Sequence, residues 1–304
     1  MTTFRITNLT QDSRLMNQIS LQRQRIAQAQ ERVTTGSRIN RPSDDPTGAG
    51  TVVRLRTSQQ ELSQLSRNAQ AAGDQLSASD TVLDSYELLL GRVKSLVAQG
   101  VSDTTTQEGR NAIATELEGL KESVLKLANR QNPDGAYFFG GTRQTAPPFD
   151  PVTATPAGTP TSPTLIQIEP QANPIQAGVT AESVFINGPD TVFSTLDELV
   201  TALRGTGNPV ADKSTLQAGL GKVTTFAQQA ISARTVIGKG LNSVETAQGY
   251  LDQYSFSLDE TLTQVAGADF AESALQLTQA NQALEATLQS GASIGRKSLL
   301  DFLG

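Results

Sequence analysis

The sequence predicts a mainly α-helical chain: an elongated coiled-coil hairpin rod, formed by the N- and C-terminal helices, with a small β-rich inserted domain. Apolar residues recur at spacings of three and four, or of seven, towards both ends of the 304-residue chain, and this heptad spacing is typical of coiled-coil packing. Ten of the thirteen prolines lie between Pro147 and Pro209. Such a density of proline excludes long helices from the middle of the chain.

The heptad pattern defines two long apolar stripes. The first predicts a helix over residues 46–99 and comprises Leu55, Leu62, Leu65, Ala69, Ala72, Leu76, Leu83, Tyr86, Leu90, Val93 and Val97. The second comprises Leu241, Val244, Leu251, Leu258, Leu262 and Val265, then Phe270, Ala274, Leu277, Leu284 and Leu288. Its phase shifts across residues 266–269, which predicts a joint before the last helix.

The composition disfavours an enzyme. The chain has no Cys, His or Trp, so thiolate chemistry, the commonest general base and the commonest metal ligand are all missing. We therefore expect no catalytic residue, no cofactor and no metal site. No apolar run approaches the ~20 residues that span a bilayer. The N-terminus shows no cleavable signal, which fits either a cytoplasmic protein or one exported without cleavage.

Charge is distributed unevenly. Residues 1–60 contain nine Arg against four acidic residues, whereas residues 250–304 contain two basic residues against seven acidic ones. The positive charges are scattered along an amphipathic helix with few aromatic residues, so nucleic-acid binding is disfavoured. Opposite charges instead favour N- and C-terminal helices that lie side by side.

A first helix is expected up to Val33, on the stripe Leu15, Ile19, Ile26, Ala29 and Val33. Its other faces carry mostly neutral Gln. The helix is therefore either one that becomes ordered only among other helices in an assembly or an ordinary frayed terminal helix.

The break that follows this first helix carries several end signals. Gly36 suits the end of one helix; Asp45 suits the N-cap and Pro46 the first position of the next, with Asp44 adding favourable charge. The adjacent carboxylates could instead form a metal site or a catalytic pair, but without His or a further acidic partner we interpret them as capping residues. Gly48 and Gly50 would allow another backbone to approach.

Further elements are predicted from local signals. A break at residues 100–106, with Thr105 and Glu108 as a capping box, starts a helix that returns along the previous one. Residues 132–135 predict a turn, and short strands are expected at 136–139, 165–168 and 184–187. Ser194 and Asp197 suit the caps of a short helix through Leu203, and helix resumes near Asp212, with an apolar stripe of Leu216, Leu220, Val223, Phe226 and Ile231.

The last residues form an apolar tip that comprises Leu299, Leu300, Phe302 and Leu303. Because the tip is short and its flanks are not strongly basic, binding to a partner helix or a chaperone is favoured over insertion into a membrane.

Several motifs resemble those of the flagellin superfamily. Residues 33–40 (VTTGSRIN) and 43–46 (SDDP) are similar to the N-terminal signature of bacterial flagellins; residues 268–272 (ADFAE) and 277–284 (LTQANQAL) are similar to the C-terminal one. The Pro residues that flank SDD at 42–46 and the segment NPDGAYFFGG at 132–141, with APPFD at 146–150, favour the hook-associated members. The resemblance covers about residues 1–150 and 210–304.

The resemblance implies an architecture of three layers. Residues 1–42 and 267–304 would form the inner tube of an axial structure, residues 43–140 and 206–266 the helical rod, and residues 141–205 a small β-rich outer domain. The motif positions imply subunit contacts by Gly36, Arg38, Ile39, Asn40, Asp44, Asp45, Pro46, Asp269 and Phe270. A chaperone site is implied at Leu299, Leu300, Phe302 and Leu303.

The implied role is a mechanical adaptor that joins the hook to the filament outside the cell, after export through the flagellar type III apparatus without a cleaved signal. The implied partners are neighbouring copies in a ring, the other hook–filament junction protein, flagellin and an export chaperone, with neither nucleic acid nor membrane. Two alternatives remain: a filament-forming flagellin and a stand-alone coiled-coil binding module.

Overall fold

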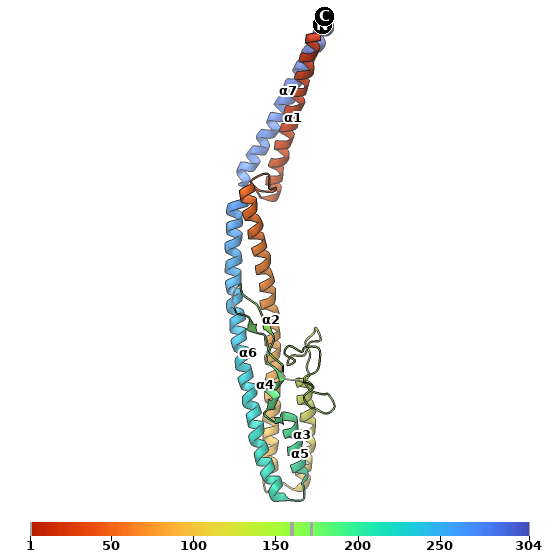
Figure 1. Cartoon of the computed structure of the whole chain (residues 1–304), viewed down its shortest axis with the longest axis vertical. Helices are drawn as coiled ribbons and strands as arrows, with labels where there is room; N and C mark the ends of the chain where they lie inside the picture. The colour runs from red at the N-terminus through yellow and green to blue at the C-terminus, as the bar shows by residue number, and fades with distance from the viewer. Residues whose placement is uncertain (1, 159–160, 171–172, 304) are drawn as a thin grey trace. The chain divides into compact units, whose positions relative to one another are not determined.

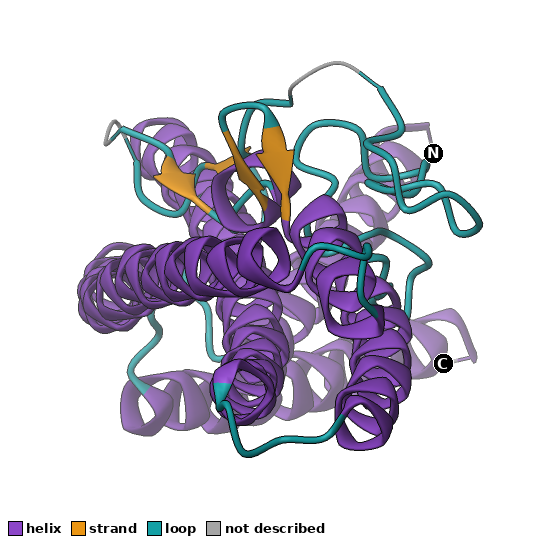
Figure 2. Cartoon of the chain, turned by 90° about the horizontal axis from the view of Figure 1, so that it is seen from below, coloured by secondary structure: helices purple, strands orange, loops and turns teal. Residues whose placement is uncertain are grey.

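The computed structural model describes residues 2–158, 161–170 and 173–303, and these are mainly α-helical, as predicted. The helices are α1 (Thr2–Thr35), α2 (Pro46–Val101), α3 (Gln107–Ala128), α4 (Ala181–Phe185), α5 (Val192–Arg204), α6 (Pro209–Ala266) and α7 (Phe270–Leu303). The strands are β1 (Leu165–Ile166), β2 (Ile175–Gln176), β3 (Ile186–Asn187) and β4 (Asp190–Thr191). Figure 2 shows how little of the chain these strands occupy.

The chain divides into two compact units. A terminal unit combines residues 1–61 with residues 254–304, and a larger unit comprises residues 62–253. Helices α2 and α6 each contribute to both units. The elongated rod and the layer boundaries at 42/43, 140/141, 205/206 and 266/267 stay predictions.

In the terminal unit, α1 and α7 lie side by side, as the opposite charges of the two ends predict (Figure 1). The Arg32 guanidinium donates to Gln276 at 3.4 Å. A Cβ added to Gly291 would stand 2.6 Å from Leu15, so glycine allows close packing there. The predicted apolar stripe is only partly buried, however: Phe270 is 68% and Leu288 47% exposed. For these two residues the expectation of a continuous packed seam is wrong.

In the larger unit, α2 and α6 pack along a seam of small and large apolar residues. The residues buried on the seam face of α2 include Leu62, Ala69, Ala72, Leu76, Ser79, Leu83, Tyr86, Leu90, Val93 and Val97. Those of α6 include Leu216, Val223, Phe226, Ala230, Ala233, Ile237, Val244, Ala247 and Leu251. The predicted seam residue Ile231 is 41% exposed, because Ala230 and Ala233 hold the two seam positions beside it.

Helix α3 returns along α2, as predicted, with Arg92 of α2 paired to Glu116 of α3 at 2.6 Å. Its N-cap is Thr106, whose side chain accepts from Gly109 N; the prediction of Thr105 was wrong by one residue. Thr105 instead donates its hydroxyl proton to the carbonyl of Gln99, near the end of α2.

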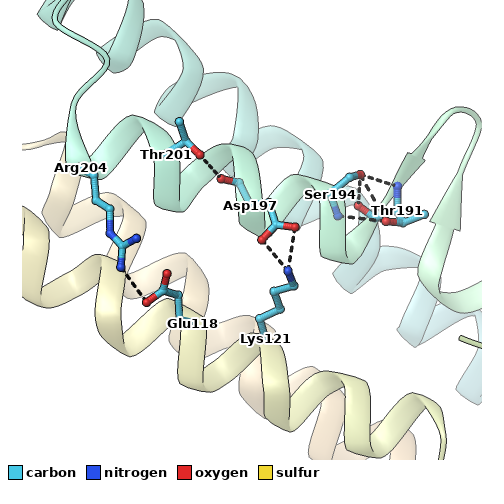
Figure 3. A network of polar contacts seen from close by, with 7 residues as sticks. All are labelled: Glu118, Lys121, Thr191, Ser194, Asp197, Thr201 and Arg204. Carbon is cyan, nitrogen blue, oxygen red and sulfur yellow. Dashed lines mark hydrogen bonds and ion pairs between the residues drawn. The ribbon is translucent and has the colours of Figure 1, made fainter. Parts of the chain in front are cut away.

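Helix α5 packs against α3 (Figure 3). The N-cap of α5 is Thr191, in a capping box with Ser194, and not Ser194 or Asp197 as predicted. Asp197 binds Lys121 of α3 through both carboxylate oxygens, at 2.6 and 2.7 Å. Arg204 binds Glu118 at 2.8 Å. The two ion pairs therefore flank the contact between α3 and α5.

The segment after α3 forms turns. Gly135 has a φ of +82° and donates its backbone N–H to Asn132 O, which confirms the turn at 132–135. The strand predicted at 136–139 is absent from this described segment, because Tyr137 makes only an isolated bridge with Gln131. Phe139 is fully buried and packs in the core of the larger unit.

The insertion contains two short antiparallel hairpins, β1–β2 and β3–β4. The strand predicted at 165–168 is confined to β1, and residues 184–185 of the strand predicted at 184–187 end helix α4 instead. The ring of Phe185 contacts Tyr86 of α2, Phe139 and Phe149, with centroids 4.7, 5.2 and 5.8 Å away. The aromatic residues of the insertion therefore help to form the core of the larger unit.

One loop of the insertion holds a strained residue. Ala154 has a φ of +55°, is buried and donates its N–H to Asp150 O at 2.9 Å. Left-handed backbone costs an L-residue roughly 1–2 kcal/mol, which glycine avoids at a smaller entropic cost.

We expect Ala154→Gly to raise the free energy of unfolding by roughly 0.5–1 kcal/mol. Chemical denaturation measures this change. Ala157 has no left-handed backbone, so the control Ala157→Gly should lower the free energy of unfolding. A lower free energy of unfolding in both variants would contradict the prediction.

Candidate functional site

Two breaks in the helices face each other within the terminal unit. Residues 36–45 join α1 to α2, and residues 267–269 join α6 to α7. Arg38 N donates to Ala266 O at 2.6 Å, and Ala268 N donates to Gly36 O at 2.9 Å. These hydrogen bonds flank an antiparallel bridge between Ser37 and Gly267. We call this arrangement, residues 36–48 with 265–270, the joint.

The first connection caps the end of α6. The hydroxyl of Ser37 donates to Ala266 O at 3.1 Å, and the Arg38 guanidinium donates to Val265 O at 2.9 Å. Carbonyls in the last turn of a helix have no partner within the helix, so residues from the opposite end of the chain satisfy them. Gly36 supplies the left-handed turn that directs the chain away from α1, with a φ of +64°, as predicted.

The two adjacent carboxylates have separate structural roles. Asp45 accepts from Gly48 N at 2.9 Å, which confirms it as a cap of α2, and lies 3.6 Å from the Arg38 guanidinium. Asp44 accepts from the backbone amides of Asn40 and Arg41 at 3.1 and 2.9 Å, so it closes the connection itself. The side-chain amide of Asn40 donates to Ser37 O at 3.0 Å.

A small apolar cluster lies beneath these polar contacts. Ile39, 5% exposed, packs with Val52 and Ala266, and the partly buried Ala49, Leu262 and Val265 surround them. A Cβ added to Gly48 would lie 2.5 Å from Ile39 Cδ1 and from Asp45 Oδ2. The expectation that another backbone approaches at Gly48 is therefore wrong, because the close neighbours are side chains. Gly50 has no atom within 4 Å of an added Cβ, so the expectation is wrong there.

Asp269 begins α7 by accepting from the backbone amides of Ala271 and Glu272 at 2.8 and 3.1 Å. The next residue, Phe270, leaves its ring 68% exposed. An exposed aromatic ring is the kind of side chain that anchors protein–protein contacts.

All nine residues that the motifs single out lie within the joint, although the two motifs are more than 220 positions apart in the sequence. Gly36, Arg38 and Ile39 contact the segment 265–268, whereas Asp269 makes its hydrogen bonds within α7 and Phe270 is exposed. Sequence reasoning missed the contributions of Ser37 and of the Val265 and Ala266 carbonyls, because backbone acceptors carry no sequence signal. A role of the nine residues in contacts between subunits stays a prediction. The apolar tip, Leu299, Leu300, Phe302 and Leu303, belongs to α7, but its side chains lie outside the described residues.

Acid should weaken the joint through Asp44. The hydrogen bond from Arg41 N, the largest effect, holds the pKa of Asp44 below its ordinary value of 3.8. A lowered folded-state pKa stabilises the folded state above the unfolded-state pKa, and this stabilisation is lost as the pH falls through the folded-state value.

We therefore expect Asp44→Asn to lower the melting temperature of the terminal unit at pH 6. The difference from wild type should shrink as the pH falls below the ordinary Asp pKa of 3.8. Thermal unfolding followed by circular dichroism, at pH 6 and at a pH below 3.8, measures this difference in melting temperature. Glu260→Gln, at an exposed position of α6, is the control. A difference that does not change with pH would contradict the assignment.

Across the described parts of the chain, no group of three or more His, Cys, Asp or Glu side chains is arranged to hold a metal ion. No helix there combines the length and the hydrophobicity that crossing a bilayer requires. The joint thus consists of helix caps, a small apolar cluster and exposed side chains.

Comparison with known proteins identifies the class of this chain. Residues 6–144 match the family model described as the bacterial flagellin N-terminal helical region. The resemblance to the flagellin superfamily is confirmed: the chain is similar to flagellin-type proteins of the bacterial flagellum.

Over most of its length the chain is similar to flagellar hook-associated protein 3, and also to the flagellin of Listeria monocytogenes, which is 23% identical over 263 residues, 84% of this chain and 83% of that protein. The *Escherichia coli* (strain K12) protein is 23% identical over 278 residues, which cover 86% of this chain and 87% of that protein. The *Salmonella typhimurium* protein is 30% identical over 123 residues, 40% of this chain and 39% of that protein. The fold matches a putative flagellar hook-associated protein from *Vibrio parahaemolyticus*, with a TM-score of 0.68, 21% identity, and coverage of 74% of this chain and all of that one.

Proposed function

We propose that this chain is a hook-associated junction protein, which connects the flagellar hook to the flagellin filament as a mechanical adaptor. The observation that carries the proposal is the similarity to hook-associated protein 3 along 87% of that protein's length. A flagellin-type N-terminal region and a joint built from both terminal motifs support the same role. In this role the protein acts by shape and contact, without catalysis.

The proposal assigns partners to the parts of the chain. Residues 1–42 and 267–304 would pack in the inner tube against neighbouring copies, the other hook–filament junction protein and flagellin. The exposed ring of Phe270 would contact one of these neighbours, and Arg38, Asp44 and Asp45 would hold the joint in the geometry that assembly requires. Leu299, Leu300, Phe302 and Leu303 would bind an export chaperone before the protein reaches the flagellum outside the cell.

A deletion strain tests the proposed role. Cells without this protein should carry hooks that lack filaments and should shed flagellin into the medium, and the wild-type gene on a plasmid should restore filaments. Filaments on the deletion strain would overturn the proposal. Absence of secreted flagellin, with polymerisation of the purified protein into long filaments, would instead identify the chain as a filament-forming flagellin.

A further inference from the structure

A single arginine binds three carboxylates across the seam of the larger unit. Arg234 of α6 lies 2.9 Å from Asp80 through Nε, and its Nη1 lies 2.9 Å from Asp84 and 3.1 Å from Glu87. Asp80 also accepts from Nη2 at 3.3 Å. Because the acids stand at i, i+4 and i+7, they line one face of α2. We call these four residues the clamp.

Apolar packing near the clamp discriminates weakly between alignments of α2 with α6. Leu76 packs where α6 has Gly240, since a Cβ added there would lie 2.9 Å from Leu76 Cδ1. The residues seven positions before and after Gly240 are Ala233 and Ala247, both on the seam. A slide of one heptad would therefore place Leu76 against a single methyl group and would leave every seam residue on the seam.

The charges beside Arg234 discriminate more strongly between these alignments of α2 with α6. A slide of seven residues in one direction would place Arg234 beside positions 87, 91 and 94, which are Glu, Gly and Lys. A slide in the other direction would place it beside positions 73, 77 and 80, which are Gly, Ser and Asp. Each slide leaves one carboxylate of three, and the first also adds a repulsive ammonium group.

We infer that the clamp of Arg234 with Asp80, Asp84 and Glu87 selects the register in which α2 pairs with α6. Polar groups at the seam of a coiled coil are known to specify register in this way. A slide of one heptad would carry every α6 residue of the seam past its partners by about 10 Å. The contacts between the insertion and the two helices form only in the register that the clamp selects. One example is the hydrogen bond that Gln229 of α6 donates to Ile186 O at 3.1 Å.

The chain has no Cys, so cross-linking of introduced Cys pairs by a short bismaleimide reports the register directly. Gln248 donates to Gln70 at 3.5 Å, so the two side chains meet, and the pair Gln70→Cys with Gln248→Cys reports the observed alignment. Ser63→Cys and Ser77→Cys, each paired with Gln248→Cys, report a slide of one heptad in either direction. In the otherwise wild-type chain, the cross-linker should trap the 70–248 pair almost alone.

Arg234→Gln should raise the trapped slid fraction about tenfold, as should 1 M NaCl on the chain with Arg234 intact. Lys239→Gln removes a cation of α6 that forms no ion pair among the described residues, and it should change nothing. Arg234→Glu with Asp80→Arg, Asp84→Arg and Glu87→Arg should restore the 70–248 pair. Trapping of that pair alone in Arg234→Gln, with helicity retained, would overturn the inference. If Arg234→Gln does not fold, unchanged trapping in 1 M NaCl would overturn it.

Discussion

Replacement of Phe185 by alanine is expected to lower the free energy of unfolding of the larger unit by about 3–5 kcal/mol. The side chain is fully buried, and its ring packs against Tyr86 of α2 and against Phe139 and Phe149. Truncation would remove these contacts and leave a cavity that rigid neighbouring helices cannot close. Because Phe185 ends α4 in the insertion, the loss measures how far the insertion stabilises the whole unit.

Denaturant unfolding followed by circular dichroism gives the value. Val152→Ala is a suitable control, because this residue of the same insertion is 91% exposed and its truncation should cost under about 0.5 kcal/mol. A loss below about 1 kcal/mol for Phe185→Ala would show that the insertion folds without supporting α2, contrary to the packing described above.

The second large effect is expected at Gly267. A Cβ at this position would overlap the backbone carbonyl oxygen of Thr263, which cannot rotate away as a side chain could. Gly267→Ala should therefore disrupt the hydrogen bond from Gly267 N to Thr263 O, and with it the neighbouring bond from Arg38 N to Ala266 O. We expect a local loss of about 2–3 kcal/mol, which corresponds to a roughly 30- to 150-fold increase in opening of the joint.

Limited trypsin digestion can detect this opening, because Arg38 lies in the joint and is followed by Ile39, which trypsin accepts. Cleavage after Arg38 should accelerate in Gly267→Ala. Gly50→Ala provides the matched control: an added Cβ there has no neighbour within 4 Å, and alanine should slightly stabilise the helix. Equal cleavage rates in the two variants would mean that the two breaks do not depend on each other.

If the proposed junction role holds, Gly267→Ala should also impair filament attachment without preventing folding of the larger unit. The reason is that Gly267 belongs to the terminal unit, whereas the core around Phe185 belongs to the larger one. Phe185→Ala should have the opposite pattern, with its main effect on stability. The two variants therefore separate the role of the joint from that of the core.

The sequence identified the long helices and most of their ends, because the signals there are local. Gly36, Asp45 and Pro46 end and begin helices through their own φ preferences and side-chain acceptors. Prediction was less accurate where several residues of similar capping ability compete. Thr105 and Thr106 are adjacent hydroxyl residues, and only the course of the backbone makes Thr106 the N-cap of α3.

The short elements of the insertion were the least predictable. Val184 and Phe185 favour a strand by composition, yet they end a helix because that conformation places Phe185 among the buried aromatic rings. Ile231 follows an apolar pattern but lies on the exposed side of α6, since small residues are needed where that helix approaches α2. Burial among distant residues decided both outcomes, and a local pattern contains no information about those partners.

The sequence by itself determined the helical character, the positions of the breaks and the pairing of oppositely charged ends, because periodicity, caps and net charge depend on neighbouring residues. Only the tertiary structure decided that residues 36–45 cap α6, that the insertion completes the core of the larger unit and that Arg234 faces three carboxylates. The physical reason is that each of these contacts joins groups far apart in the chain, so their energies exist only after the helices have packed.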